Sequence, residues 1–408
     1  MLCDVLLQDG KISAVRPADS LEIPADTQIL PAGGKHLFPS FIDAHAHLRE
    51  PGHEYKEDIA SGLNAAAHGG FGTVFAMGNT SPCNDASSVT RFMLERARQA
   101  WPHGPRLCPV GALTLGLEGA ALAPMGELAQ AGCIAFSNDG RPVADTELFR
   151  RGMEYAAQWG KIVIDHCEDP FLAKGSHMNE GRMSGRLGVK GQPGVAEALH
   201  VARDILLAEY LDLPVHVAHI SCRQSVELLL FAKARGVRIT AETCPHYLFL
   251  DESELDGYNT AAKVNPPLRS AVDAAAVRKA LCNGLFDMLV TDHAPHAAHE
   301  KEDTLDAAPS GFIGLETAVP LTFSLVSQGE LPLTDFISLW HHGPARIFKL
   351  PAVTFTPGDA ADLFLFDPDQ EWRASRETLH SKSLNTPFLG RVLRGKVLAH
   401  WLGGHRIV

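Results

Sequence analysis

The stretch Phe41-Ile42-Asp43-Ala44-His45-Ala46-His47-Leu48-Arg49-Glu50-Pro51-Gly52 begins apolar and ends polar, which is typical of a buried strand that runs out into a loop. Alternate residues of a strand point to the same face, so His45, His47 and Arg49 are expected on one side. Two neighbouring imidazoles can bind one divalent cation, and Zn²⁺ favours such nitrogen ligands. A guanidinium beside them could hold a substrate carboxylate through two hydrogen bonds. An isolated His-x-His pair more often packs the end of a strand, so the residues downstream decide between the two interpretations.

The stretch opens a series of eight short apolar runs between residues 39 and 348. Helix-like segments, such as 146–158 and 196–211, separate several of these runs. Because strand–helix alternation predicts parallel strands, eight such units predict an α/β fold, a (β/α)8 barrel of the TIM type. A doubly wound open sheet is the alternative, but no Gly-x-Gly-x-x-Gly motif follows a strand. The runs span residues 41–42, 72–77, 107–113, 133–136, 162–164, 215–218, 237–240 and 288–290.

Both ends of the chain are instead rich in β-type runs broken by turns. The Asp9-Gly10 step predicts a hairpin, and Gly395 predicts a second turn. We therefore expect residues 1–38 and 349–408 to form one small β-sandwich domain, with residues 39–348 as the catalytic barrel. The runs at the two ends span residues 5–12, 29–34, 362–367 and 392–398.

The composition of the 408-residue chain excludes several classes of function. A formal net charge of −12 without a basic tract disfavours nucleic-acid binding. No stretch of about 20 apolar residues is free of charge, and the N-terminus lacks a signal pattern, so we expect no membrane segment. The eight cysteines are scattered without a Cys-x-x-Cys pair, which is typical of reduced thiols in a cytoplasmic protein.

Side chains that can bind metals follow the ends of most predicted strands. In a (β/α)8 barrel the chemistry lies at the carboxyl ends of the strands. Each residue has a plainer explanation on its own: Asp139 before Gly140 suits a turn, and Asp292 suits a helix cap. Their joint occurrence at successive strand ends is hard to explain in that way, and the set is large enough for two metal ions bridged by a carboxylate. The strand-end residues are His45, His47, Asn79, Asp139, His166, His219 and Asp292.

Such a ligand set predicts an enzyme that hydrolyses amide-like C–N bonds of a small molecule, or forms them in reverse. A bound metal turns water into hydroxide near neutral pH and can polarise a carbonyl group. A carboxylate beside that water can accept its proton and pass it to a leaving nitrogen. Asp292 is the candidate for this proton transfer.

On these residues the chain resembles the amidohydrolase superfamily and, within it, the bacterial class I dihydroorotase family. The resemblance covers nearly the whole chain, and its last two motifs are fairly specific to that branch. By contrast, residues 242–248 (Glu-Thr-Cys-Pro-His-Tyr-Leu) are more similar to the hydantoinase branch. The motifs that carry the resemblance are 41–52, Phe136-Ser137-Asn138-Asp139-Gly140, Asp165-His166-Cys167-Glu168-Asp169, Asn265-Pro266-Pro267-Leu268-Arg269, Asp292-His293-Ala294-Pro295-His296 and Ser381-Lys382-Ser383-Leu384-Asn385-Thr386-Pro387-Phe388.

The resemblance implies reversible cyclisation of N-carbamoyl-L-aspartate to L-dihydroorotate with loss of water, a step of de novo pyrimidine (UMP) biosynthesis. It also implies a homo-oligomer, with a dimer as the expected state, and a possible complex with aspartate transcarbamoylase. One or two Zn²⁺ ions would be held by His45, His47, Asp139, His166, His219 and Asp292. The substrate would contact His47, Arg49, Asn79, Asn265 and His296, and the backbone near Ser310 and Gly311.

Two other functions stay open from the sequence. One is another cyclic-amide hydrolase of the hydantoinase or allantoinase type. Those branches use a carboxylated lysine at the end of the fourth strand, whereas residues 132–136 contain no lysine and Asp139 stands just beyond them, so we predict no carboxylysine. The other is a non-catalytic dihydroorotase-like partner of aspartate transcarbamoylase, which would be expected to have lost ligands, while this chain keeps all six.

Overall fold

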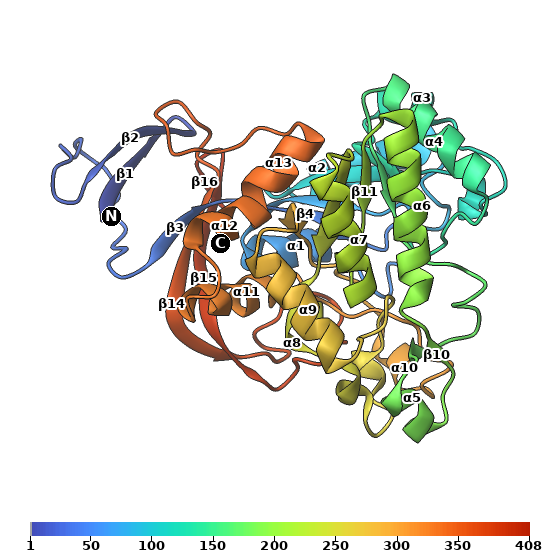
Figure 1. The fold of residues 1–408 in the computed structure, drawn as a ribbon. Helices are drawn as coiled ribbons and strands as arrows, with labels where there is room; N and C mark the ends of the chain where they lie inside the picture. The colour runs from blue at the N-terminus through green and yellow to red at the C-terminus, as the bar shows by residue number, and fades with distance from the viewer. Residues whose placement is uncertain (1) are drawn as a thin grey trace.

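Residues 2–408 are described by a computed structural model (Figure 1). Met1, the first residue of the expected small domain, lies outside the described residues. Within the described part, parallel strands form an eight-stranded sheet in the order β13-β12-β11-β8-β7-β6-β5-β4. A parallel bridge between Ala46 and His293 joins the two ends of this sheet. The predicted (β/α)8 barrel is therefore confirmed, and the open doubly wound alternative is wrong.

The barrel strands overlap all eight apolar runs, and helices follow most of them. The strands are β4 (Phe41–Ala46), β5 (Phe71–Ala76), β6 (Arg106–Ala112), β7 (Ala135–Ser137), β8 (Val163–Asp165), β11 (Val215–Val217), β12 (Ile239–Thr243) and β13 (Met288–Leu289). The helices of the barrel region are α1 (Ile59–Gly69), α2 (Ser87–Ala100), α3 (Met125–Ala131), α4 (Thr146–Gln158), α5 (Arg182–Leu187), α6 (Val195–Leu211), α7 (Arg223–Ala234), α8 (Pro245–Phe249), α9 (Ala271–Cys282), α10 (Ala298–Lys301), α11 (Ala318–Ser327), α12 (Leu333–Ile337) and α13 (Gly343–Phe348). Two short strands, β9 (Met178–Asn179) and β10 (Gly191–Gln192), pair in the long loop after β8.

Helix α1 shows how local sequence sets the boundaries of these elements. The Asp58 carboxylate accepts a hydrogen bond from the Ser61 N–H, and the Asp58 N–H donates to the Ser61 hydroxyl. This reciprocal capping satisfies amide groups that the first turn leaves free. At the other end Gly70 takes a φ of 87°, which a glycine adopts without steric cost, and the chain turns directly into β5.

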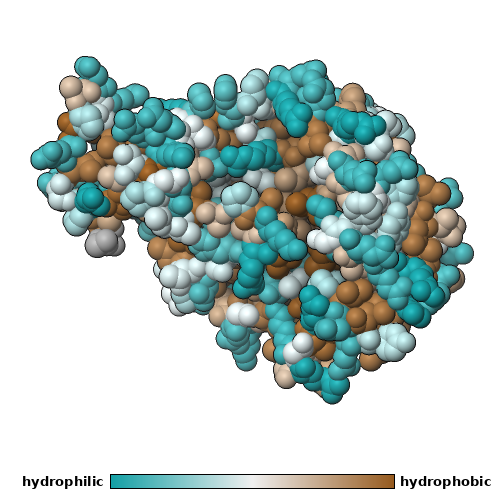
Figure 2. Space-filling view, turned by 90° about the horizontal axis from the view of Figure 1, so that it is seen from above, coloured by the Kyte–Doolittle hydropathy of each residue, from teal (hydrophilic) through white to brown (hydrophobic). Residues whose placement is uncertain are grey.

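Strands from both ends of the chain meet in one antiparallel sheet, as the sequence predicts. Its order is β16-β15-β14-β3, formed by β3 (His36–Pro39), β14 (Leu363–Arg373), β15 (Val392–Leu402) and β16 (His405–Arg406). Strands β1 (Cys3–Gln8) and β2 (Lys11–Pro17) form the expected hairpin around Asp9-Gly10. Figure 1 shows this hairpin projecting at the left, and Figure 2 shows the same projection from above, with hydrophilic and hydrophobic residues interspersed.

Two local predictions near the chain ends are wrong. Residues 29–34 form coil and turn, although Ile29 and Leu30 look β-like, and Pro31 cannot donate a ladder hydrogen bond. Gly395 does not make a turn, because β15 continues through it with a φ of 105° where the pairing with β14 is irregular. A side chain at this position would collide with the ring of Phe366. Close packing, rather than a turn, therefore requires this glycine.

The small sheet packs against the amino-terminal end of the barrel. The rings of Phe41 in β4 and Phe364 in β14 have centroids 4.8 Å apart. Polar contacts converge on Ser40 between β3 and β4: its hydroxyl lies 2.7 Å from Nε2 of His400, and its carbonyl oxygen lies 2.8 Å from Nδ1 of His341. Because Ser40 precedes β4, this junction lies at the opposite end of the strand from His45. Among residues 2–408, no helix is long and apolar enough to cross a membrane.

Candidate metal centre and substrate pocket

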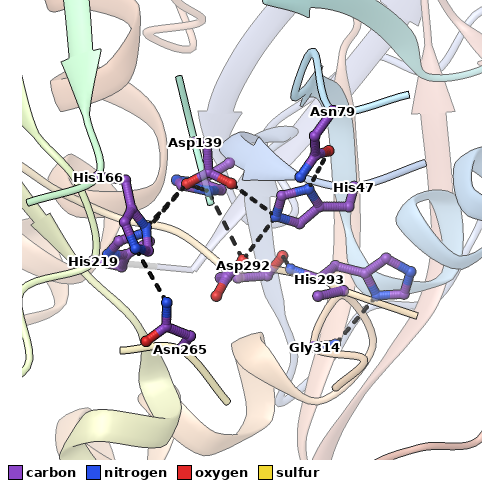
Figure 3. A network of polar contacts seen from close by, with 12 residues as sticks. His47, Asn79, Asp139, His166, His219, Asn265, Asp292, His293 and Gly314 are labelled. Atoms are coloured by element: carbon purple, nitrogen blue, oxygen red, sulfur yellow. Dashed lines mark hydrogen bonds and ion pairs between the residues drawn. The ribbon is translucent and has the colours of Figure 1, made fainter. Parts of the chain in front are cut away.

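Six buried His and Asp side chains meet at the carboxyl end of the barrel (Figure 3). Parallel strands bring their carboxyl ends to one rim, so residues distant in sequence become neighbours there. His45 is the penultimate residue of β4 and His47 lies just beyond it, and the other four follow β7, β8, β11 and β13. The six side chains are those of His45, His47, Asp139, His166, His219 and Asp292.

Asp139 lies between two groups of histidines. On one side its carboxylate oxygens are 3.3 Å from Nε2 of His45 and 3.4 Å from Nε2 of His47. On the other side it lies 3.4 Å from Nδ1 of His166 and 3.4 Å from Nε2 of His219. Within each group the three ligand atoms lie within 4.8 Å of one another. The carboxylate is thus shared by two three-residue groups, each of which could hold one metal ion.

Asp292 completes the side of the centre that holds His47. Its Oδ1 lies 3.1 Å from Nε2 of His47 and 3.8 Å from Nε2 of His45. Although burial alone would raise the pKa of Asp292, the hydrogen bond from His47 and the charge of His45 lower it to about 2. Asp292 is therefore a carboxylate at neutral pH, so it can accept a proton.

The chemistry of this donor set fits a divalent cation. Nε2 of His45 is buried and has no hydrogen-bond partner among residues 2–408, although it points at Asp139. Burial alone would lower the pKa of His166, but Asp139 and Glu168 raise it to about 10. The carboxylates therefore create a negative potential that favours positive charge at this point, and the unpartnered imidazole nitrogen supplies a free lone pair.

Three residues of the site take backbone conformations that a sequence pattern does not reveal. Arg49, His219 and Asp292 have φ values of 64°, 33° and 46°. Non-glycine residues in this region cost about 1–3 kcal/mol each, so the surrounding fold must stabilise them. These positive φ values change the direction of the chain after β4, β11 and β13.

A buried chain of hydrogen bonds supports the His45 ring on the side away from Asp139. The sequence alone did not assign a role to the residues of this chain. Nδ1 of His45 donates to Glu242 at 2.8 Å, and Nε2 of His216 donates to the other oxygen of Glu242 at 2.9 Å. Nδ1 of His216 in turn lies 2.8 Å from the hydroxyl of Thr240. His216 is thus a satisfied core histidine. The available signal was the alternation of Thr240 and Glu242, two polar residues on the same face of the buried strand β12.

A pocket beside the His166 group contains Asn265. Its Nδ2 donates to Glu168 at 2.8 Å and lies 3.2 Å from Nε2 of His166. Gln192 from β10 also donates to Glu168, at 2.8 Å. Glu168, Gln192, Asn265 and Ser310 are among the residues that line this pocket. Glu168 is therefore a further residue of the site. The sequence showed it only as part of the motif 165–169 and did not predict a role for it.

The remaining substrate-binding candidates lie at the rim. Arg49 is half-buried and donates from Nε to the Pro295 carbonyl at 3.0 Å, while its Nη2 lies 3.2 Å from Nε2 of His296. Burial lowers the pKa of Arg49 to about 10, so it remains cationic at neutral pH. Nε2 of His296 donates to the carbonyl of Ser310 at 2.9 Å. The structure therefore brings together Arg49, His296 and Ser310.

Asn79 and Gly311 are held by the protein itself. Nδ1 of His47 lies 2.9 Å from Oδ1 of Asn79, which leaves the Asn79 amide nitrogen for another partner. The N–H of Gly311 donates to the Lys263 carbonyl at 2.9 Å, and its own carbonyl accepts from Asn385 at 3.0 Å. At Gly311 the predicted backbone contact thus competes with existing hydrogen bonds.

The parallel barrel is closed and gathers two histidine groups around one carboxylate, with a half-buried arginine beside them. These features define the class of barrel hydrolases that use metal ions. A family model described as Dihydro-orotase-like matches residues 34–225. A dihydroorotase of Syntrophus aciditrophicus is 45% identical over 99% of this chain and 94% of its own length. A dihydroorotase of Geobacter metallireducens is 43% identical over 98% of this chain and 94% of its own length. The chain belongs to the dihydroorotase family, so the resemblance carried by its motifs is confirmed, and it is an enzyme.

Solved structures support the fold separately. An L-hydantoinase (dihydropyrimidinase) from Arthrobacter aurescens superposes with a TM-score of 0.88 at 24% identity, covering 100% of this chain and 92% of the other. A D-hydantoinase (dihydropyrimidinase) from Thermus sp. gives a TM-score of 0.83 at 25% identity, covering 100% and 92%. This similarity shows that the barrel and the sheet from both chain ends occur together in other proteins.

Proposed function

We propose that this enzyme catalyses the reversible cyclisation of N-carbamoyl-L-aspartate to L-dihydroorotate with loss of water, in pyrimidine biosynthesis. The observation that carries the proposal is the half-buried cation Arg49 beside the histidine groups that share Asp139. A fixed guanidinium suits a ring that bears a carboxylate and offers little to a neutral hydantoin or dihydropyrimidine ring. Relatives about 45% identical over almost the whole chain carry the name dihydroorotase, which supports the same assignment.

We propose Zn²⁺ as the metal, with one or two ions per chain, because imidazole and carboxylate donors suit it. When bound, zinc would activate the attacking water and polarise the scissile carbonyl group. His45, His47 and Asp292 would hold one ion, His166 and His219 the other, and Asp139 would bridge them.

Asp292 is the proposed proton carrier. In ring opening, the water oxygen bonds to the ring carbonyl carbon while the carbon–nitrogen bond breaks. Asp292 accepts a proton from the water and delivers it to the departing nitrogen, and ring closure reverses both transfers. The contact of 3.1 Å with His47 and the lowered pKa support this role, since both keep the carboxylate ionised and oriented.

The substrate would lie between the metal centre and the rim. Arg49 would bind the ring carboxylate with help from Asn79 and His296. Asn265 would donate to the ring from the side of the His166 group, and His47 and the backbone at Ser310 and Gly311 would line the remainder. Contacts of Arg49 with His296, and of His296 with Ser310, support a common binding surface.

The deciding experiment is ultraviolet-monitored ring opening of L-dihydroorotate by the zinc-loaded protein, with hydantoin, dihydrouracil and allantoin run in parallel. We expect turnover of dihydroorotate alone, lost on chelation and restored by zinc. Turnover of a neutral ring would assign the enzyme to the hydantoinase or allantoinase type instead. If no substrate is turned over even after aspartate transcarbamoylase is added, the chain is a non-catalytic partner.

The proposal extends to the location, assembly and domain division of the protein. We infer a cytoplasmic homo-oligomer, a dimer, that can assemble with aspartate transcarbamoylase; light scattering of the protein with and without that enzyme tests both states. We also infer that residues 1–38 with 349–408 form one folding unit and residues 39–348 the other. Pairing of β3 with β14 supports this division.

A further inference from the structure

Two lysines are buried next to segments that line the candidate substrate pocket, at positions where a charged side chain is costly. The exposed fractions of Lys263 and Lys301 are 4% and 9%. Both ammonium groups end on backbone carbonyls. Nζ of Lys263 donates to the carbonyls of Leu305 and Ala308, each at 2.6 Å. Nζ of Lys301 donates to the carbonyl of Pro309 at 2.7 Å.

These bonds tie two segments of the barrel rim together. Besides Pro309, Nζ of Lys301 reaches the carbonyls of Thr260 at 3.1 Å and Lys263 at 3.3 Å. In the opposite direction, the hydroxyl of Thr260 donates to the carbonyl of Lys301. The N–H of Gly311 donates to the carbonyl of Lys263 at 2.9 Å. Residues 260–265 and 301–311 are therefore joined by bonds from both sides, and we call this arrangement the lysine clamp.

The lysine clamp lies directly beside proposed substrate contacts. Lys263 is two residues before Asn265 in the sequence. Pro309, whose carbonyl accepts from Lys301, directly precedes Ser310. Asn265 and Ser310 both line the pocket next to the metal centre. The distance between these two walls of the pocket therefore depends on the bonds that the lysines make.

Burial lowers the pKa of both lysines, because it disfavours their charged forms. Burial, with the nearby charges of Lys263 and Arg49, lowers the pKa of Lys301 to about 7; Lys56 acts in the same direction and Glu300 opposes it. An apolar side chain could fill the same space without this cost. Such placement is expected where the hydrogen bonds of the ammonium groups hold a functional geometry.

We propose that Lys263 and Lys301 are positioning residues that fix Ser310 and Gly311 opposite Asn265 and so set the width of the substrate pocket. The inference rests on the proposed function, because it takes these residues as substrate contacts. Neither lysine touches the reacting atoms. Because the pocket walls contact the substrate both before and during reaction, loosening them should weaken binding more than it slows chemistry.

The test compares Lys263→Met and Lys301→Met with Lys233→Met, a control away from the pocket whose half-buried side chain also pairs with Asp287 at 2.7 Å. Lys233 also bonds a backbone carbonyl, that of Leu285 at 2.5 Å, but this contact lies before β13, at the other end of the barrel. For the two clamp variants we expect KM for dihydroorotate to rise about tenfold or more while kcat changes less than about threefold. Amide hydrogen exchange in residues 302–311 should accelerate about tenfold or more in the same variants. The control should change neither quantity.

Unchanged KM and unchanged exchange in both variants would overturn the proposal, as would a loss of thermal stability alone, equal to that of Lys233→Met. If Lys263→Met does not fold, Lys301→Met decides, because it removes fewer bonds to the loop. If the wild-type enzyme turns over no dihydroorotate, the proposed function fails. Faster exchange in residues 302–311 of the variants would then still show the clamp, and unchanged exchange would refute it.

Discussion

Substitution Glu242→Gln tests whether a buried carboxylate sets the metal affinity of His45. Glu242 is fully buried and accepts hydrogen bonds from His45 at 2.8 Å and from His216 at 2.9 Å. Its negative charge makes the His45 ring a better electron-pair donor and holds Nε2 toward the centre. Glutamine keeps the size and one acceptor oxygen but removes the charge, and its amide nitrogen can face His216.

The expected loss of zinc affinity follows from the weakened hydrogen bond between His45 and residue 242. A hydrogen bond to a charged group contributes about 1.5–3 kcal/mol, and part of it survives as a neutral bond. Loss of about 1.4 to 2.8 kcal/mol corresponds to a 10- to 100-fold weaker zinc affinity, since each tenfold change is about 1.4 kcal/mol. This range agrees with the usual effect of removing a partner behind a metal-binding histidine.

Zinc affinity is measured by competition with a chelating dye, which does not depend on turnover. The matched control is Glu57→Gln. Glu57 is equally buried, but its carboxylate accepts from Ser381 and from the Lys382 N–H and contacts none of the six proposed ligands. Equal zinc affinity in Glu242→Gln and the wild type, with far-UV circular dichroism unchanged, would refute the reasoning. An equal loss in both variants would indicate general destabilisation.

Three further outcomes are expected. Arg49→Ala should raise KM for dihydroorotate about tenfold or more, because the substrate carboxylate loses its cationic partner; an unchanged KM in steady-state assays would contradict the carboxylate contact. Asp292→Asn should lower kcat by about 10²- to 10⁴-fold with the fold intact by circular dichroism, and full activity would refute the proton-transfer role. Burial lowers the pKa of both His341 and His400 from 6.5 to about 4, so between these values the unfolded chain binds protons that the folded chain does not. Stability should therefore fall as pH falls from 6.5 to 4, by up to about 3 kcal/mol for each histidine. Urea unfolding should show a smaller change over this range for His400→Gln, and equal changes would contradict the assignment.

Much of the architecture follows from local patterns. Short apolar runs separated by helical segments are enough to predict a parallel barrel, because each run must be buried on both faces. Once the barrel is inferred, the strand ends near Asp139, His166 and Asp292 must share one rim, so their proximity follows without coordinates. Motifs then identify the family, because they record residue types at those rim positions.

Other features depend on how distant segments meet. Glu242 on β12 stands behind His45 on β4 only because the barrel closes between Ala46 and His293. Lys263 holds the Ser310 loop only because two rim segments distant in sequence pack together. Likewise, Gly395 looks like a turn until the ring of Phe366 is placed against it.

The sequence by itself therefore determined the barrel, the family and the residue types at the strand ends, since periodicity and motifs are local properties. Only the tertiary structure decided which charges face one another, because long-range register, loop packing and burial set those distances. The sharing of Asp139 between two histidine groups and the lysine clamp are both of this second kind.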